Sequence, residues 1–377
     1  MLNIVQIHTD SKFIDEGMSR FESKFFRNTL IIFKGGRKYH GKHREIANVF
    51  KRNRKSIKKI IDICSNADLV VLFDLDEIKS YITNRLPKET KIAWRFFGHE
   101  LYGRKTKTFL SKLTIEAIKN KWFFYLWQRL KRRLKKIKGY IKWGVDFEKE
   151  FKIALKRVDY FLCTSQEECN FLKKIWPGLP QFIRFPIINS IKAIAGNLDK
   201  RGLPVVVGHN KIVWNNHLEL IEIIGNSNNR KKHNFLLLFS YGLENKYTRT
   251  VREKASGYPE IKFIEKFMSK EEFEVFYSQV SALVINTYRQ AGLGNIFQAI
   301  KNGVKVYLNG KNIVLQWLKN ERFLIFTIKD FANDIEDDNL ALGKQEIIYN
   351  QKRLDNMLGK RSIEDFQKAI YDKINEF

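Results

Sequence analysis

RQAGLGN, at positions 289–295, is the stretch from which we start. An apolar run, SALVIN, ends shortly before it and is typical of a buried strand, and IFQAIKNG follows it as a helical pattern that stops at a glycine. In a parallel α/β sheet, ligands bind at the carboxyl ends of strands, where a helix amino terminus attracts anions. We therefore expect Gly292 and Gly294 to let the backbone approach a diphosphate, and Arg289 to add a cation.

The composition is that of a globular, strongly basic protein. The chain has 377 residues, enough for two domains of ordinary size, and 44% of them are hydrophobic. Lys and Arg number 69 against 41 acidic residues, a formal net charge of +28, which indicates a polyanionic partner such as nucleic acid, anionic lipid or a phosphorylated substrate. The three cysteines show no paired-metal spacing, and we expect a reducing cytoplasm.

Membrane-spanning and secreted classes are not favoured by the sequence. No apolar run approaches the roughly 20 residues that a bilayer-spanning helix needs. The first residues, MLNIVQI, form a short strand pattern without the basic start and long apolar core of a signal peptide. We expect a protein that is soluble or lies on a membrane surface.

Apolar strand patterns alternate with helical patterns along the whole chain, which predicts an α/β fold with parallel, doubly wound sheets. Glycines and a proline between 190 and 204 mark a boundary. We place a Rossmann-like amino-terminal domain at 1–195 and a Rossmann-like carboxyl-terminal domain at 203–377. The expected strands are at 4–7, 30–33, 67–73, 91–96, 158–163 and 182–186, then at 204–208, 234–239, 261–264, 281–286 and 304–308.

A basic amphipathic insertion at about 119–150 interrupts the first domain. Its apolar residues recur at helical spacing between Lys and Arg, and an aromatic cluster opens it. One interpretation is a solvated helix packed on the domain by its leucine stripe. The other is a dock for anionic lipid headgroups. Nucleic acid is less expected, because stacking aromatics would lie beside the cations and not at one helix end. The membrane-surface candidates are Trp122, Phe123, Trp127, Arg129, Arg132, Arg133 and Lys136.

Two Rossmann-like halves joined by a short linker are typical of the GT-B architecture, and the residues resemble glycosyltransferase family 56 from about 98 to 317. In the first half, WRFFGHELY at 94–102 is similar to the family's W-x-x-x-G-x-D-L-Y segment, with Glu100 in place of the Asp. The other residues that carry the resemblance are CT at 163–164, FP at 185–186, VGHN at 207–210, NH at 216–217, YG at 241–242, EKF at 265–267 with Phe273, and RQAGLG at 289–294.

The resemblance implies two domains that face each other across a cleft, with the nucleotide sugar on the carboxyl-terminal one. It implies transfer of a 4-acetamido-4,6-dideoxyhexose or fucose-like sugar, from TDP, to a polyprenyl-diphosphate-linked saccharide. That reaction belongs to surface polysaccharide synthesis of the enterobacterial common antigen or O-antigen type. The partners would be the donor, the lipid-linked acceptor and an anionic membrane surface, with no nucleic acid and no metal. The expected location is the cytoplasmic face of the inner membrane, as a peripheral protein.

The resemblance also implies the donor site. Its candidates are Gly208, Asn210, Asn216, His217, Tyr241, Gly242, Glu265, Arg289, Gln290, Gly292, Gly294 and Asn295. Arg289 would stabilise the charge that develops on the leaving diphosphate. A carboxylate of the first domain would act as base, and Asp10 and Glu100 are the candidates. Each has a plainer alternative, since strand-end acids often cap helices, a histidine in a turn is often structural, and Glu265 can be a surface ion pair.

Two other function classes remain open from the sequence. Asp74-Leu75-Asp76 follows an apolar strand, and this Asp-x-Asp pattern is the metal-binding signature of the GT-A glycosyltransferases. In that case a divalent ion would do the work we assign to Arg289. Capping of a helix by these acids is the alternative that fits two Rossmann-like halves. The remaining class is a non-catalytic basic protein that binds lipid or nucleic acid.

Overall fold

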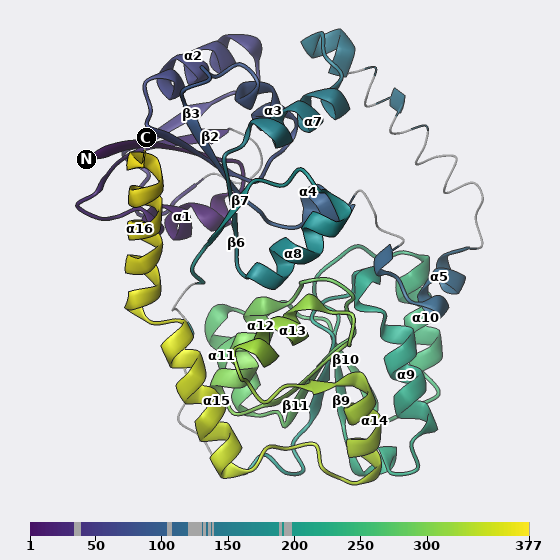
Figure 1. Ribbon diagram of the computed structural model, residues 1–377. Helices are drawn as coiled ribbons and strands as arrows, with labels where there is room; N and C mark the ends of the chain where they lie inside the picture. The colour runs from purple at the N-terminus through teal and green to yellow at the C-terminus, as the bar shows by residue number, and fades with distance from the viewer. Residues whose placement is uncertain are drawn as a thin grey trace. The chain divides into compact units, whose positions relative to one another are not determined.

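The structure is a computed structural model, which describes residues 1–33, 39–103, 108–119, 139–187 and 198–376 and a few single residues between these ranges. The chain divides into two compact units, and each is described here by itself (Figure 1). The first unit comprises Met1–Arg104, Phe123–Ile188 and Gly359–Phe377, and the second comprises Lys105–Trp122 and Asn189–Leu358. No helix among the described residues is both long and apolar enough to cross a membrane.

The first unit is a parallel sheet flanked by helices. Its described strands lie in the order β3-β2-β1-β4-β5-β6-β7, and every neighbouring pair is parallel. The strands are β1 Leu2–His8, β2 Phe26–Phe33, β3 Ala47–Phe50, β4 Leu69–Phe73, β5 Lys91–Arg95, β6 Tyr160–Cys163 and β7 Gln181–Arg184. The helices are α1 Ile14–Arg20, α2 Arg54–Ser65, α3 Glu77–Thr83, α4 His99–Tyr102, α7 Phe147–Arg157, α8 Gln166–Ile175 and α16 Lys360–Asn375.

The second unit repeats this plan. Its described strands lie in the order β10-β9-β8-β11-β12-β13, again all parallel. They are β8 Val205–Val207, β9 Phe235–Leu238, β10 Ile261–Ile264, β11 Ala282–Ile285, β12 Lys305–Leu308 and β13 Phe326–Thr327. The helices are α5 Lys112–Lys119, α9 His217–Asn226, α10 Lys246–Ala255, α11 Lys270–Ser278, α12 Leu293–Lys301, α13 Ile313–Asn320, α14 Ile328–Glu336 and α15 Lys344–Met357.

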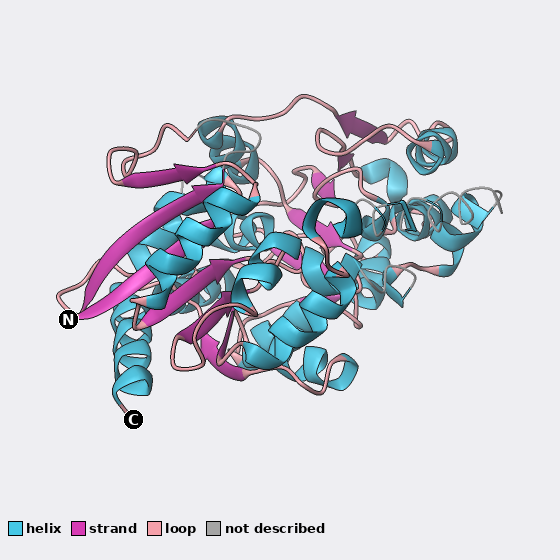
Figure 2. Ribbon diagram, turned by 90° about the horizontal axis from the view of Figure 1, so that it is seen from above, coloured by secondary structure: helices cyan, strands magenta, loops and turns pink. Residues whose placement is uncertain are grey.

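Burial on both faces explains why the central strands are apolar throughout. Every residue of β4, β8 and β11 is buried, because helices cover both sides of a parallel sheet (Figure 2). Local capping then sets where helices begin. Ser269 and Glu272 exchange side-chain and backbone hydrogen bonds at the start of α11, as Asn245 and Thr248 do at α10. The predicted pair of Rossmann-like α/β domains is confirmed.

Each sheet has one point where the strand order reverses. In the first unit the chain moves outward from β1 to β2 and β3, and then returns to the other side of β1 with β4. In the second unit the same reversal lies between β8 and β11. The helices that follow the two strands at such a point go to opposite faces of the sheet, so the carboxyl ends of these strands form the crevice where α/β proteins bind ligands.

The structure divides the chain differently from the predicted ranges 1–195 and 203–377 at two places. The carboxyl-terminal helix α16 belongs to the first unit, where the Gln367 amide donates to the carbonyl oxygens of Arg20 and Glu22 at 3.1 and 3.2 Å. The segment that contains α5 belongs to the second unit, where the Leu113 N–H donates to Glu219 at 3.0 Å. These contacts join residues far apart in sequence. The glycines and proline that mark a domain boundary carry no information about such contacts.

Residues 120–129, 131, 132, 135, 136 and 138 of the predicted insertion at 119–150 lie outside the described residues, including Trp122, Phe123, Trp127, Arg129, Arg132 and Lys136. Arg133 is described and is exposed. Leu130, Leu134 and Ile137, from the predicted apolar stripe, are 53%, 48% and 53% exposed. From Trp143 onward the chain packs on the first unit, since that buried ring lies 5.8 Å from the Tyr81 ring.

Packing of α16 in the first unit can be tested by removing its main aromatic contact. The Phe366 ring lies edge-on to Phe21 and Phe185, each at 5.3 Å. We expect Phe366→Ala to lower the free energy of unfolding of this unit by about 3–5 kcal/mol, because it leaves a cavity among aromatic side chains. The control is Lys368→Ala, at an exposed position of the same helix, with an effect within about 0.5 kcal/mol. Urea denaturation followed by circular dichroism gives both values, and equal effects would contradict the packing.

Candidate functional site

The loops after β8 and β11 meet at the strand reversal of the second unit. Gly208 follows β8 with φ of +71°, and its N–H donates to the carbonyl oxygen of Val284 on β11 at 2.8 Å. A β-carbon at Gly208 would lie 2.7 Å from Nε2 of His217, closer than real side chains come. Only glycine therefore combines this backbone conformation with this approach.

The glycine loop of the opening stretch begins α12. Gly292 precedes the helix with φ of +69°, and a β-carbon there would lie 3.1 Å from both the His209 ring and the Ile285 side chain. The β8 loop therefore touches the β11 loop at this point. A β-carbon at Gly294 would meet no atom within 4 Å, so the space beside the first turn of α12 is open. The free N–H groups of that turn suit an anion.

Arg289 supplies the positive charge of this site. Its guanidinium lies over the Trp214 ring at 4.3 Å and donates to the Gln290 carbonyl oxygen at 3.3 Å. Burial, and next the charge of Arg289, lower the pKa of His209 to about 4. His209 is therefore neutral at physiological pH, and the cation at the loop junction is Arg289. A stacked guanidinium beside a helix amino terminus is suited to a diphosphate.

Buried asparagines hold the two loops together. Asn216, with φ of +49°, accepts from the Ser111 N–H and hydroxyl at 2.9 and 3.0 Å and donates to the Asn286 carbonyl oxygen at 3.0 Å. Asn286 returns a hydrogen bond to the carbonyl oxygen of Asn216, also at 3.0 Å. The Asn215 amide donates to Asn210 at 2.7 Å. Asn210 and Asn216, which we predicted to contact the donor, thus use their side chains within the protein.

His217 is also part of this internal framework. Its ring is fully buried, with Nδ1 at hydrogen-bond distance, 2.9 Å, from the Tyr247 hydroxyl, and it lies edge-on to Phe239. Burial lowers the pKa of His217 to about 3, with a further contribution from His209. His217 is thus a neutral, buried imidazole that supports the loop. A structural role of this kind is the alternative to the predicted contact between His217 and a phosphate.

Of the remaining donor candidates, Tyr241, Gly242 and Glu265 follow the strands β9 and β10, and Asn295 lies in the first turn of α12. Tyr241 is 55% exposed, and the adjacent Gly242 has φ of +126°. Glu265 forms an ion pair with Arg252, which is the surface salt bridge that the sequence left as the alternative. The Asn295 side chain accepts from the Tyr277 hydroxyl at 2.9 Å.

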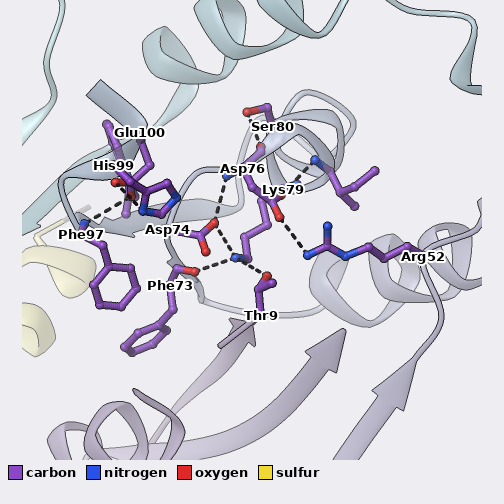
Figure 3. Close-up of polar contacts among 12 residues, drawn as sticks. Thr9, Arg52, Phe73, Asp74, Asp76, Lys79, Ser80, Phe97, His99 and Glu100 are labelled. Atoms are coloured by element: carbon purple, nitrogen blue, oxygen red, sulfur yellow. Dashed lines mark hydrogen bonds and ion pairs between the residues drawn. The ribbon is translucent and has the colours of Figure 1, made fainter. Parts of the chain in front are cut away.

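In the first unit, the two predicted base candidates have different environments. Asp10 is exposed and accepts the Lys12 N–H at 3.1 Å, which makes it a cap of the short turn that follows β1. Glu100 is buried, and its Oε1 accepts from the Trp94 indole and the Phe97 N–H, both at 3.2 Å. Its Oε2 lies 3.5 Å from His99 (Figure 3).

The Asp-x-Asp pair is held by protein cations. Asp76 caps α3 by accepting the N–H groups of Ile78 and Lys79 at 2.9 and 2.8 Å, and it pairs with Arg52 at 3.3 Å. Asp74 pairs with the buried ammonium of Lys79 at 2.7 Å (Figure 3). The capping interpretation of Asp76 is therefore correct. The GT-A alternative is wrong, because the chain forms two separate parallel sheets of the Rossmann type.

Sequence reasoning missed several residues that shape both sites. Trp214, Asn215 and Asn286 support the β8 and β11 loops, and Lys79 holds Asp74. A tryptophan in the loop after β8 and a lysine in α3 carry no sequence signal of such contacts. The asparagines beside the predicted turns were the available hint, since Asn is common where the backbone is left-handed.

The comparisons with solved structures agree on the fold over the whole chain. Anabaena HepE in complex with UDP and glucose is 10% identical, with 100% of both chains covered and a TM-score of 0.64. Sucrose-phosphate synthase from Thermosynechococcus elongatus is 12% identical, with 99% of each chain covered and a TM-score of 0.65. A glycosyltransferase from Rickettsia africae is 14% identical, with 99% of this chain and 98% of that chain covered and a TM-score of 0.63.

At these identities the likeness shows the fold. The chain has the GT-B fold, as the sequence predicted. No protein-family model and no curated protein matches the chain.

The steric requirement at Gly208 leads to a test of the site's construction. Gly208→Ala would combine a left-handed backbone with a β-carbon 2.7 Å from the His217 ring. We expect it to lower the free energy of unfolding of the second unit by about 1–3 kcal/mol. Gly294→Ala, where the added β-carbon meets open space, should change it by less than about 0.5 kcal/mol. Thermal or urea denaturation gives the values, and a Gly208→Ala protein as stable as the parent would contradict the geometry.

Proposed function

We propose that this protein is a glycosyltransferase that takes its sugar from a nucleoside diphosphate. The observation that carries the proposal is the meeting of two glycine turns, Arg289 and the open amino terminus of α12 at the strand reversal of the second unit. Backbone N–H groups and a fixed guanidinium there would bind the two phosphates and stabilise the charge that develops on them as the glycosidic bond breaks. Two solved neighbours with this fold, HepE structures with UDP and with UDP-glucose, support a nucleotide-sugar ligand.

We infer the donor and the acceptor class from the resemblance to glycosyltransferase family 56. The donor is a TDP-linked 4-acetamido-4,6-dideoxyhexose or fucose-like sugar, and the acceptor is a polyprenyl-diphosphate-linked saccharide of surface polysaccharide synthesis. We propose that Tyr241, which is 55% exposed, contacts the nucleotide base. Arg289 and the helix terminus supply the positive charge at the phosphates, so the proposal requires no metal.

We further propose that the protein works on the cytoplasmic face of the inner membrane. The net charge of +28 favours an anionic surface. The described part of the basic insertion leaves Leu130, Leu134 and Ile137 about half exposed, and exposed apolar side chains among cations are typical of an interfacial helix. A lipid-linked acceptor would be reached from that surface.

Arg289→Ala tests the donor site. We expect it to lower turnover of the donor by at least about 100-fold, because a preorganised charge at the leaving diphosphate is lost. Before the assay, a thermal-shift screen with TDP, UDP and GDP identifies the nucleotide, since a bound ligand raises the melting temperature. The matched control is Arg249→Ala, an exposed arginine of α10 with the same change of charge.

Three outcomes would contradict the proposal. If Arg289→Ala and Arg249→Ala lower turnover alike, Arg289 does not serve the donor diphosphate, and if the parent protein turns over no donor, a basic binding protein without this chemistry is favoured. If EDTA abolishes turnover and Mg²⁺ or Mn²⁺ restores it, the metal-independent form of the proposal is wrong. A folded Arg289→Ala protein, checked by circular dichroism, is required for the first comparison.

Membrane binding has its own test. Replacing Arg129, Arg132, Arg133 and Lys136 with alanine should weaken binding to phosphatidylglycerol vesicles by about 1 kcal/mol for each cation that meets the surface. Vesicle sedimentation measures the change. The control replaces four exposed cations of the second unit, Lys231, Lys232, Arg249 and Lys262, and should leave binding close to that of the parent protein. Equal losses would mean that net charge alone, and not the insertion, drives binding.

A further inference from the structure

The strand reversal of the first unit holds a buried ion pair that the proposed donor site does not use. Asp74 directly follows β4, and Thr9 directly follows β1, so both lie at the carboxyl ends of the two reversal strands. Lys79, from the first turn of α3, reaches both of them (Figure 3). This is the position in an open α/β sheet where ligands bind.

Each of the three hydrogens of the Lys79 ammonium group has an acceptor in the protein. It donates to the Thr9 hydroxyl at 2.8 Å, to the Phe73 carbonyl oxygen at 2.6 Å and to Asp74 Oδ1 at 2.7 Å. The side chain is fully buried. Burying a charged pair has a large desolvation cost that only close and complete hydrogen bonding offsets. The pair therefore holds the Asp74 carboxylate in one orientation.

Asp74 itself is held in an unusual conformation. Its φ is +70°, a left-handed backbone that non-glycine residues seldom adopt and that is found at functional sites. Oδ1 accepts from Lys79 and also from the Asp76 N–H at 3.0 Å. Among the described residues none hydrogen-bonds to Oδ2, and the side chain is 10% exposed. One oxygen is therefore fixed by the protein, and the other is left for a ligand at the strand reversal.

The charges around Asp74 suit a proton acceptor. Burial raises the pKa of Asp74 to about 6, Lys79 acts in the opposite direction, and the carboxylates of Asp76 and Glu100 raise it further. Arg52 pairs with Asp76, and the stacked ring of His8 on Phe73 stays neutral because burial and Lys79 hold its pKa well below the ordinary value. A carboxylate with this pKa is ionised at neutral pH and is more basic than an exposed one.

We propose that Asp74 is the general base for the acceptor hydroxyl, and that Lys79 is the residue that positions it. This inference rests on the proposed function. The acceptor O–H proton moves to Asp74 Oδ2 while the acceptor oxygen forms a bond to the anomeric carbon of the donor sugar. The bond from that carbon to the diphosphate oxygen breaks, and its electron pair leaves with the nucleoside diphosphate. A single displacement of this kind inverts the anomeric configuration.

The two base candidates predicted from the sequence fit this role less well. Asp10 is an exposed cap whose carboxylate accepts the Lys12 N–H at 3.1 Å, and no buried cation in the described part of the chain holds it. Glu100 is buried, with one oxygen already accepting two hydrogen bonds and the other beside His99. Asp74 combines an orientation fixed by a buried cation with an oxygen that no described residue occupies.

Asp74→Asn is the decisive variant. Asparagine tolerates the left-handed backbone and its oxygen can still accept from Lys79 and Asp76, so the fold should persist. The assay uses UDP-glucose, GDP-fucose and the TDP-linked 4-acetamido-4,6-dideoxygalactose as donors and a prenyl-diphosphate-linked disaccharide as acceptor, at pH 7.5. With the donor that the parent protein uses, we expect turnover to fall by about 10²–10⁴-fold. Its affinity for the nucleoside diphosphate should stay within about twofold, because Arg289 and the α12 terminus are intact.

Asp68→Asn is the matched control, since Asp68 is an exposed carboxylate just before the opposite end of the same strand and accepts the Asn3 N–H at 2.7 Å. It should keep turnover within about threefold of the parent. If Asp74→Asn keeps turnover in the same range, Asp74 is not the base while the proposed function stands. If the parent transfers none of the three sugars and binds none of the nucleotides, the proposed function fails and this assignment fails with it.

Two further measurements separate a positioning role of Lys79 from a structural one. The kcat/KM of the parent should rise with pH through about 6, because the base must be ionised. Lys79→Met removes the charge that favours the ionised form of Asp74, so this rise should move to higher pH, whereas a merely structural role would leave it in place. Proton NMR of the product should show an inverted anomeric centre, and retention would overturn the assignment of Asp74.

Discussion

The left-handed backbone at Gly208 and Gly292 is the constraint on which the proposed donor site depends. A β-carbon at Gly208 would collide with His217, and one at Gly292 would crowd His209 at 3.1 Å. Because the backbone turns there without a β-carbon, the β8 and β11 loops can touch and the first turn of α12 stays open. The position of Arg289 over Trp214 follows from this approach of the loops.

In the first unit, a buried ion pair and not a pair of glycines shapes the strand reversal. A buried lysine and a strained aspartate occupy the strand reversal where the second unit has glycines and an arginine. Positive charge at an open helix terminus suits phosphate, whereas a carboxylate oriented by a buried ammonium suits a hydroxyl proton. The two units therefore share a topology but carry opposite charge beside their strand reversals, on the Asp74 carboxylate and on the Arg289 guanidinium.

Much of the fold could be predicted because its signals are local. Fully apolar runs such as that of β4 indicate strands covered on both faces, and glycines after them indicate turns. The donor candidates were less predictable. Gly208 and Gly292 lie in turns after strands, as predicted. The polar groups of Asn216 and His217, however, contact Ser111, Asn286 and Tyr247. Those partners are distant in sequence, so no local pattern shows that the side chains are already engaged.

The sequence by itself determined most of the strands, turns and helices, though not β3 and β13, together with the basic balance of charge and the place of the glycine loop before α12. Periodicity and turn residues act over a few positions, so a sequence pattern can show them. Only the tertiary structure decided which polar side chains support the loops and which remain available to a ligand. It also decided that α16 packs in the first unit and that Lys79 reaches Asp74 and Thr9. The physical reason is that burial and hydrogen bonding depend on contacts between residues that are distant in the sequence and become neighbours only in the folded structure.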